Sequence, residues 1–167
     1  MILAESIYHS FCYCFSDERK MIKKILVATD GSEPAKHAVE FAATSAEKWN
    51  ASLLVLSVVP PSTAIYAGMG GYDNSFTAEH EKATTSFHVG VLENVKKSLK
   101  EKYPELNVST QIKKGIVAKN ILEVSEEAEV DLIVIGSRGL GGLTGWFLGS
   151  VTNHVVNHCT KPILVVK

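Results

Sequence analysis

Short apolar runs alternate along the chain with longer segments in which apolar side chains recur every three or four residues. The apolar runs cover 25–28, 52–59, 106–113, 132–135 and 162–166, and the helical periodicity covers 35–49, 77–102, 117–128 and the stretch after 150. Continuous apolar runs of this length are typical of parallel strands buried on both faces, whereas 106–113 alternates in polarity and suits an edge strand. The pattern therefore predicts an α/β domain, with an open, mainly parallel sheet covered by helices on both faces.

The first predicted helix has clear start and stop signals. Ser32 supplies a hydroxyl cap, and Glu33 and Pro34 follow in the first turn. The helical pattern ends near Asn50. The glycine-rich stretch 61–77 is predicted to be a loop before the next helix.

A glycine-rich loop follows the apolar run 132–135. Its spacing is Gly136-x2-Gly139-x9-Gly149-Ser150, and a helix is predicted to begin near 147–150. Amide groups at a helix N-terminus lack helical partners and carry partial positive charge, so a strand that leads through glycines into a helix favours an anion. The spacing is neither that of a Walker A loop nor that of a dinucleotide-binding loop. The alternative is a turn whose glycines only allow the helix to pack close to the strand.

Two charged residues accompany this loop. Asp30 follows the first apolar run, at the edge of a parallel sheet where ligands bind, and could accept hydrogen bonds from ribose hydroxyls. Its alternative role is to cap the turn that follows. Arg138 lies between two of the glycines, and it either reaches a phosphate or is an exposed loop arginine.

Composition narrows the classes of function. The 167 residues carry a net charge of −1, which provides no electrostatic field for nucleic acid or an anionic membrane surface. No apolar run is long enough to span a bilayer, and three cysteines are too few for a disulfide framework, so we expect a cytoplasmic protein. His154 and His158 stand one helical turn apart without a matching third ligand, and Cys12 and Cys14 lack a second pair. We therefore expect no metal site.

Three separated motifs resemble those of the universal stress protein family. They are KKILVATDGS at 23–32, the glycine loop with its G-x2-G-x9-G-[ST] spacing, and KPILVVK at 161–167. The resemblance covers 21–167 and implies a five-stranded Rossmann-like sheet of order 3-2-1-4-5. We expect residues 1–20 to be an extension that is either disordered or precedes the natural start at Met21.

The resemblance also implies a site for ATP, with or without Mg²⁺, although ADP or a cyclic nucleotide stays open. Adenosine would lie between Asp30 and Val58, and the phosphates would lie against the glycine loop. The residues assigned to this site are Ala28, Thr29, Asp30, Val58, Gly115, Gly136, Arg138, Gly139, Gly149, Ser150 and Val151. The last strand, Pro162–Val166, is expected to pair with its twin in a homodimer.

The function implied is that of an ATP-binding regulatory protein of the stress response. No Walker lysine and no general base beside a nucleophile is recognisable, so hydrolysis would be slow at most. The alternatives are a dimeric adaptor of the same family that binds no nucleotide, or a weak ATP hydrolase or adenylate-forming enzyme.

Overall fold

The computed structural model describes residues 21–61, 74–140 and 148–167. Strands and helices alternate along them. The elements are β1 (Lys24–Ala28), α1 (Glu33–Trp49), β2 (Ser52–Val59), α3 (Asn74–Lys102), β3 (Val108–Lys114), α4 (Val117–Glu127), β4 (Leu132–Gly136), α5 (Ser150–His158) and β5 (Ile163–Val166). The expected extension at 1–20, with its two cysteines, lies outside the described residues, as does most of the expected loop at 61–77.

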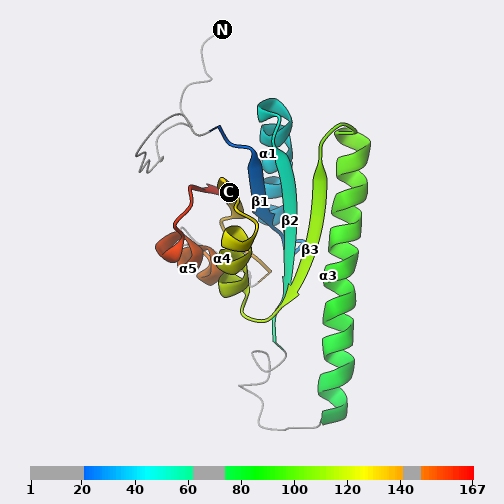
Figure 1. Ribbon diagram of the computed structural model, residues 1–167. Coiled ribbons are helices and arrows are strands. Elements are labelled where there is room, and N and C mark those ends of the chain that lie inside the picture. The colour runs from blue at the N-terminus through cyan, green and yellow to red at the C-terminus, as the bar shows by residue number, and fades with distance from the viewer. Residues whose placement is uncertain (1–20, 62–73, 141–147) are drawn as a thin grey trace.

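The five strands form one parallel sheet in the order β3-β2-β1-β4-β5, which confirms the predicted fold class (Figure 1). Ala28 at the end of β1 is level with Leu56 of β2 on one side and with Ile135 of β4 on the other. All strands therefore end at the same edge, which we call the carboxyl edge, and all begin at the opposite amino edge.

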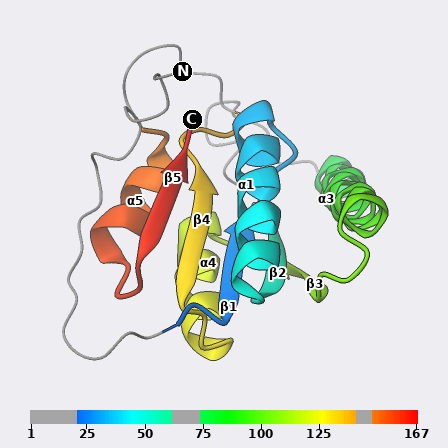
Figure 2. The same ribbon diagram turned by 90° about the horizontal axis from the view of Figure 1, so that it is seen from above.

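Each face of the sheet is covered by two helices (Figure 2). Ile25 and Val27 face α1 and α3, whereas Leu26 between them faces α4 and α5, as the two-residue period of a strand requires. All three side chains are fully buried. The burial of β1 on both faces explains why its sequence is continuously apolar.

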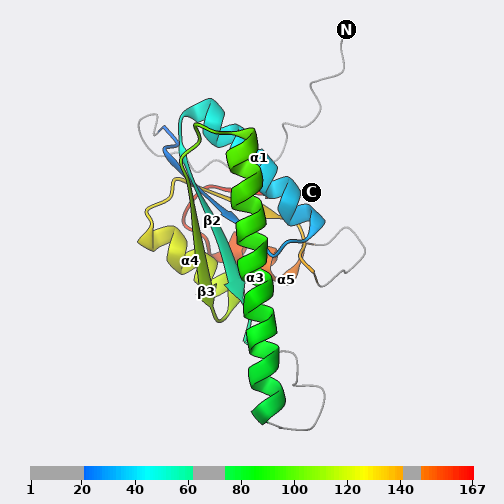
Figure 3. The ribbon, with the colours of Figure 1, turned by 90° about the vertical axis from the view of Figure 1, so that its right-hand side faces the viewer.

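Helix α3 is the longest element and runs along one side of the molecule (Figure 3). It begins at Asn74, three residues before the predicted start, and its N-terminal part extends past the carboxyl ends of β2 and β3 (Figure 1). Its apolar stripe packs on the sheet, with Leu92 and Leu99 buried and Val95 partly buried beside them. Helix α3 thus flanks the carboxyl edge as well as the sheet.

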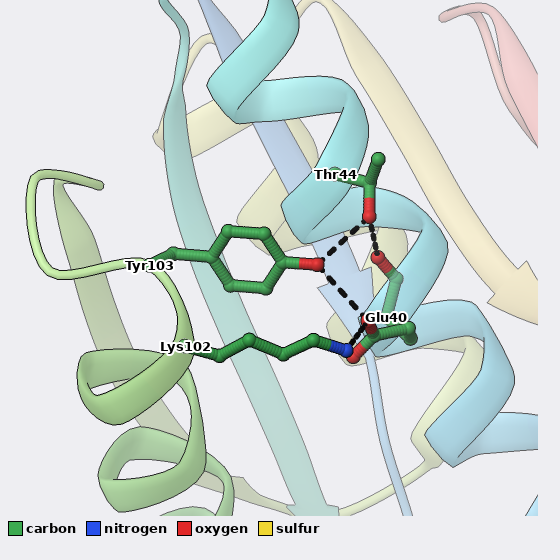
Figure 4. Close-up of polar contacts among 4 residues, drawn as sticks. All are labelled: Glu40, Thr44, Lys102 and Tyr103. Carbon is green, nitrogen blue, oxygen red and sulfur yellow. Dashed lines mark hydrogen bonds and ion pairs between the residues drawn. The ribbon is translucent and has the colours of Figure 1, made fainter.

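The C-terminal end of α3 is fastened to α1 by a group of polar side chains (Figure 4). The Tyr103 hydroxyl donates to Glu40 Oε1 at 2.9 Å and lies 2.9 Å from Thr44 Oγ1, and Lys102 pairs with the same Glu40 carboxylate. The hydrogen bond from Lys102 is the main cause that lowers the pKa of Glu40. This contact lies near the amino edge, because β3 begins there directly after α3.

One expectation about α1 needs correction. Its end is as predicted, with Asn50 in the left-handed region at φ 53°. At its start, however, Ser32 makes no side-chain cap hydrogen bond, and its Oγ is buried without a partner. The residue pattern fits a cap, but Ser32 is enclosed by neighbouring elements that a local pattern does not reveal. Trp49 continues the helical spacing of apolar residues over 35–49, yet its side chain is 44 % exposed.

None of the helices in the described part of the chain has both the length and the apolar character that crossing a bilayer demands.

Candidate functional site

Asp30 links the ends of β1 and β4. The Thr29 amide continues the sheet by donating to Leu56 O at 2.9 Å, and Asp30 then leaves the strand. Asp30 Oδ1 accepts from the Ser32 amide at 3.0 Å, and Oδ2 accepts from the Leu140 amide at 2.9 Å. A single carboxylate thus joins the turn after β1 to the glycine loop after β4.

The bond to Ser32 is the turn-capping role that the sequence left as an alternative for Asp30. The bonds from Ser32 and Leu140 leave acceptor positions on the carboxylate unused. An ionised carboxyl group has about four such positions, and the two amides use two of them. Asp30 is half-buried. The carboxylate therefore keeps the capacity to accept hydrogen bonds from a ligand.

Gly136 is needed for packing inside the protein. A Cβ added there would lie 2.9 Å from the backbone carbonyl carbon and oxygen of Pro34, in the first turn of α1. Such a contact is essentially never seen between real atoms. The alternative interpretation of the loop, close packing of a helix on a strand, therefore describes this glycine, although the helix is α1 rather than the one that follows the loop.

Gly139 and Gly149 bring the two ends of the loop together. A Cβ at Gly139 would overlap the Asp30 carboxylate, and a Cβ at Gly149 would lie 3.3 Å from Arg138 Cα. The Gly149 amide donates to Ser137 O at 2.9 Å. The small residues of the motif thus allow the loop to close over the end of β4; residues 141–147 of the loop lie outside the described residues.

Helix α5 starts directly at this closure. The hydroxyl of Thr152 donates to Gly136 O at 2.8 Å and fixes the first turn of the helix to the end of β4. Ser150 is exposed and Val151 is half-buried in that turn, and the N-cap residue, Gly149, has no side chain with which to cap it. The structure therefore places Ser150 of the motif at an accessible helix N-terminus, beside the loop that holds the half-buried Arg138.

The remaining assigned residues lie on neighbouring parts of the carboxyl edge. Ala28 ends β1, and Thr29 after it is buried. Val58 is a core residue, 5 % exposed, in the cluster formed with α4 and α5. Gly115 has φ +128°, which favours glycine, and its amide donates to Val59 O at 2.9 Å. The fold brings β1, β2, β3 and β4 residues of the predicted site to one edge.

Sequence reasoning missed a buried polar pair beside Asp30. Ser57 Oγ of β2 donates to Thr29 O at 2.8 Å and lies 2.8 Å from His88 Nδ1 of α3. Burial lowers the pKa of His88, and the nearby Asp30 charge opposes that shift. A polar residue within the apolar run of β2, and a histidine one turn before the apolar stripe of α3, were signals that could have identified the pair.

In the described part of the chain, no three or more His, Cys, Asp or Glu side chains converge to hold a metal ion. His154 and His158 stack on one another, with ring centroids 4.1 Å apart.

The family model described as the universal stress protein family matches residues 21–167. The chain belongs to the universal stress protein family. Universal stress protein YxiE of Bacillus subtilis is 33% identical over 150 residues, which cover 88% of this chain and 100% of YxiE. Universal stress protein MJ0577 of Methanocaldococcus jannaschii is also 33% identical, over 88% of this chain and 96% of its own.

Solved structures agree with the fold. The structure of MJ0577 superimposes with a TM-score of 0.69 at 31% identity, covering 88% of this chain and 96% of that one. The universal stress protein UspA of Lactobacillus plantarum gives a TM-score of 0.76 at 24% identity, covering 89% of this chain and 100% of that one. The sheet order and the helices on both faces are thus those of this family.

Proposed function

We propose that this universal stress protein binds ATP at the carboxyl edge through its 21–167 domain and acts as a cytoplasmic regulatory protein of the stress response. The observation that carries the proposal is the bond between the Asp30 carboxylate and the Leu140 amide. It brings an acceptor suited to ribose hydroxyls next to a glycine loop suited to phosphates. Both lie where the chain order of the sheet reverses, between β1 and β4, which is where open α/β sheets bind ligands.

The donor and acceptor groups at this edge fit a nucleotide. Asp30 retains acceptor positions, and the α5 N-cap Gly149 supplies no side chain to cap the first-turn amides of that helix. Ser32 Oγ is buried two residues beyond Asp30 without a hydrogen-bond partner. A buried hydroxyl without a partner costs free energy, so a ligand that reached it would recover that cost. Adenosine would lie between Asp30 and Val58, with phosphates toward Gly139, Gly149, Ser150 and Val151, and Arg138 would add a positive charge.

Family members support an adenine nucleotide as the ligand class. One universal stress protein structure is described as a complex with cAMP, and one from Archaeoglobus fulgidus as a complex with dAMP. These proteins are 24% and 21% identical to this chain, so they support the class of ligand and leave the number of phosphates open. A triphosphate is favoured here because the loop retains the G-x2-G-x9-G-[ST] spacing. With ATP, Mg²⁺ would accompany the phosphates.

The experiment is titration calorimetry of the full chain with ATP, ADP and cAMP, each with and without Mg²⁺. Two matched variants remove one negative charge each, Asp30→Asn at the carboxyl edge and Asp131→Asn at the amino edge. We expect ATP to bind most tightly. Asp30→Asn should weaken binding by at least about tenfold, because hydrogen bonds to a charged group contribute about 1.5–3 kcal/mol. Asp131→Asn should bind ATP as the wild type does.

Other outcomes identify the alternatives. Absence of binding for all three nucleotides would favour the adaptor. Steady release of phosphate by the wild type, lost in Asp30→Asn, would favour an enzyme. Equal weakening in the two variants would show that net charge, rather than the carboxyl edge, determines affinity.

We further propose a homodimer through β5. All four of its residues are only half-buried, and a shallow groove beside Val166 is lined by α1 residues that include Phe41, which is 44 % exposed. Pro162 O and Val166 O accept bonds from β4, so the alternate residues, Ile163 and Val165, direct their backbone groups outward. An exposed edge of this kind is stabilised by pairing with a second copy.

Sedimentation equilibrium tests the dimer. The wild type should have twice the mass of one chain. Val165→Pro should be a folded monomer, because proline removes an outward amide that the fold does not use. A monomeric wild type, or an unchanged dimer in the folded Val165→Pro variant, would contradict pairing through this edge.

A further inference from the structure

His88 of α3 is not among the residues that the sequence assigned to the candidate site. Its side chain is 4 % exposed, and its Nδ1 is 2.8 Å from Ser57 Oγ on β2. Ser57 is fully buried and donates its hydroxyl hydrogen to the carbonyl oxygen of Thr29, the residue immediately before Asp30. A buried chain of two hydrogen bonds therefore leads from α3 to the residue that precedes the predicted ribose acceptor.

The proton positions in this chain follow from the donor count. A serine hydroxyl has one hydrogen, and that of Ser57 is directed at Thr29 O. Ser57 must then accept from His88, so the neutral imidazole carries its hydrogen on Nδ1. The histidine holds the hydroxyl in the orientation that serves the Thr29 carbonyl.

Helix α3 also touches the turn directly. Gly31 has φ +84°, and a Cβ there would lie 2.9 Å from Val91 Cγ2 and 3.7 Å from the Phe87 ring. The Phe87 ring stands edge-on to the imidazole of His88, with centroids 5.5 Å apart. One side of the turn is therefore set by α3, and the carboxylate of Asp30 reaches the glycine loop on the other.

We propose that His88 is a positioning residue of the nucleotide site, which acts through Ser57 to fix the Thr29–Asp30 backbone and so the direction of the Asp30 carboxylate. The proposal rests on the proposed function for its ligand. It deepens that function by giving α3 a part in binding: the imidazole touches no ligand, and its contribution depends on one N–H donor at the Nδ1 position.

The test compares variants that keep or remove this donor. His88→Leu removes it and keeps an apolar side chain, Ser57→Ala breaks the same chain from β2, and His88→Asn keeps an N–H group near the Nδ1 position. His158→Leu on the exposed end of α5 serves as the matched histidine control. ATP affinity is measured by calorimetry and unfolding by urea denaturation, for each folded variant.

We expect His88→Leu and Ser57→Ala each to weaken ATP binding about three- to tenfold, the value of one hydrogen bond. The double variant should bind no more weakly than the weaker single variant, because both changes break one chain. His88→Asn should restore affinity to within about twofold of the wild type, and His158→Leu should leave it unchanged. A purely structural role would lower stability in His88→Leu and His88→Asn alike while leaving affinity unchanged, and that result would overturn the proposal.

A second readout needs no ligand and separates this proposal from the proposed function. Imidazole ¹⁵N shifts should show His88 with its hydrogen on Nδ1. The Leu140 amide resonance, which reports its bond to Asp30, should shift in His88→Leu and Ser57→Ala and return in His88→Asn. If the wild type binds no nucleotide while these shifts appear, the proposed ligand is wrong and the positioning of Asp30 by His88 stands. A hydrogen on Nε2, or an unmoved Leu140 resonance, would overturn the positioning role.

Discussion

The two edges of the sheet each place one aspartate between β1 and β4, and the surroundings of the two carboxylates differ. At the amino edge, Asp131 Oδ2 accepts from the amides of Lys23 and Lys24 at 2.9 and 3.1 Å, and the Asp131 amide donates to Lys24 O at 2.9 Å. At the carboxyl edge, Asp30 accepts from the amides of Ser32 and Leu140. Both carboxylates join segments that are more than a hundred residues apart in the sequence.

The difference lies in what surrounds each carboxylate. The Asp131 contact is a reciprocal backbone clamp at the point where two strands begin. Around Asp30, by contrast, the Ser32 hydroxyl is buried without a partner, the α5 N-cap Gly149 supplies no capping side chain, and Ser57, paired with the buried His88, donates to the neighbouring Thr29 carbonyl. An arrangement that only stabilised the fold would not leave such groups uncompensated. The same residue type thus closes a backbone clamp at one edge, and at the other it lies in the surroundings that we propose bind a nucleotide.

The largest expected effect on stability is at Gly136, and it tests whether the carboxyl edge also contributes to the free energy of unfolding. Gly136→Ala would force a Cβ against the Pro34 backbone, so we expect a loss of about 1–3 kcal/mol in the free energy of unfolding. Gly90→Ala is the matched control, because no atom outside its chain neighbours and the nearby backbone of its own helix lies within 4 Å of the added Cβ, and alanine favours the helix by up to about 1 kcal/mol. Urea denaturation measures both. If Gly136→Ala were as stable as the wild type, the close packing of this glycine on α1 would not contribute to the fold.

The smallest expected effect concerns the amino-edge side, where Glu40 fastens α1 to the end of α3. Because the pKa of Glu40 is lowered in the folded protein, its contribution to stability is present above the ordinary carboxyl pKa and disappears as the pH falls through the lowered value. Its side chain is 49 % exposed, so solvent screening limits the contribution to at most about 1 kcal/mol.

Glu40→Gln should therefore be slightly less stable than the wild type at neutral pH, and the difference should vanish in acid. ATP affinity should not change in this variant. Urea denaturation at both pH values and calorimetry at neutral pH check these points. A loss of ATP affinity would show that the Glu40 contact is coupled to the carboxyl edge, and would contradict the expectation that the two edges act independently.

Much of the fold could be predicted from the sequence. The apolar runs located the strands because β1, β2 and β4 are buried on both faces, and the alternation of β3 matched its edge position. The strand order came from the resemblance rather than from the residues, because hydrophobic pattern does not specify neighbours in a sheet. The start of α3 at Asn74 was missed because no apolar periodicity marks its first turn.

The site was predictable in its motifs and less so in its contacts. Asp30 and the glycine loop were correctly expected to lie side by side, because the fold class places the ends of β1 and β4 together. The pairing of Ser57 with His88 was not predictable, since it depends on how α3 lies across β2. Nor could spacing alone reveal that Gly136 packs on α1 and Gly139 on a carboxylate, because both contacts depend on tertiary structure.

The bond between Asp30 and Leu140 spans a sequence separation of 110 residues. During synthesis, the first strand leaves the ribosome long before the segment that completes its carboxylate's surroundings. This bond therefore cannot form on a partial chain, and it requires that β4 has taken its place in the sheet. If the proposed nucleotide binds at this edge, its binding would be a late event in folding, and the bound nucleotide would selectively stabilise the completed fold.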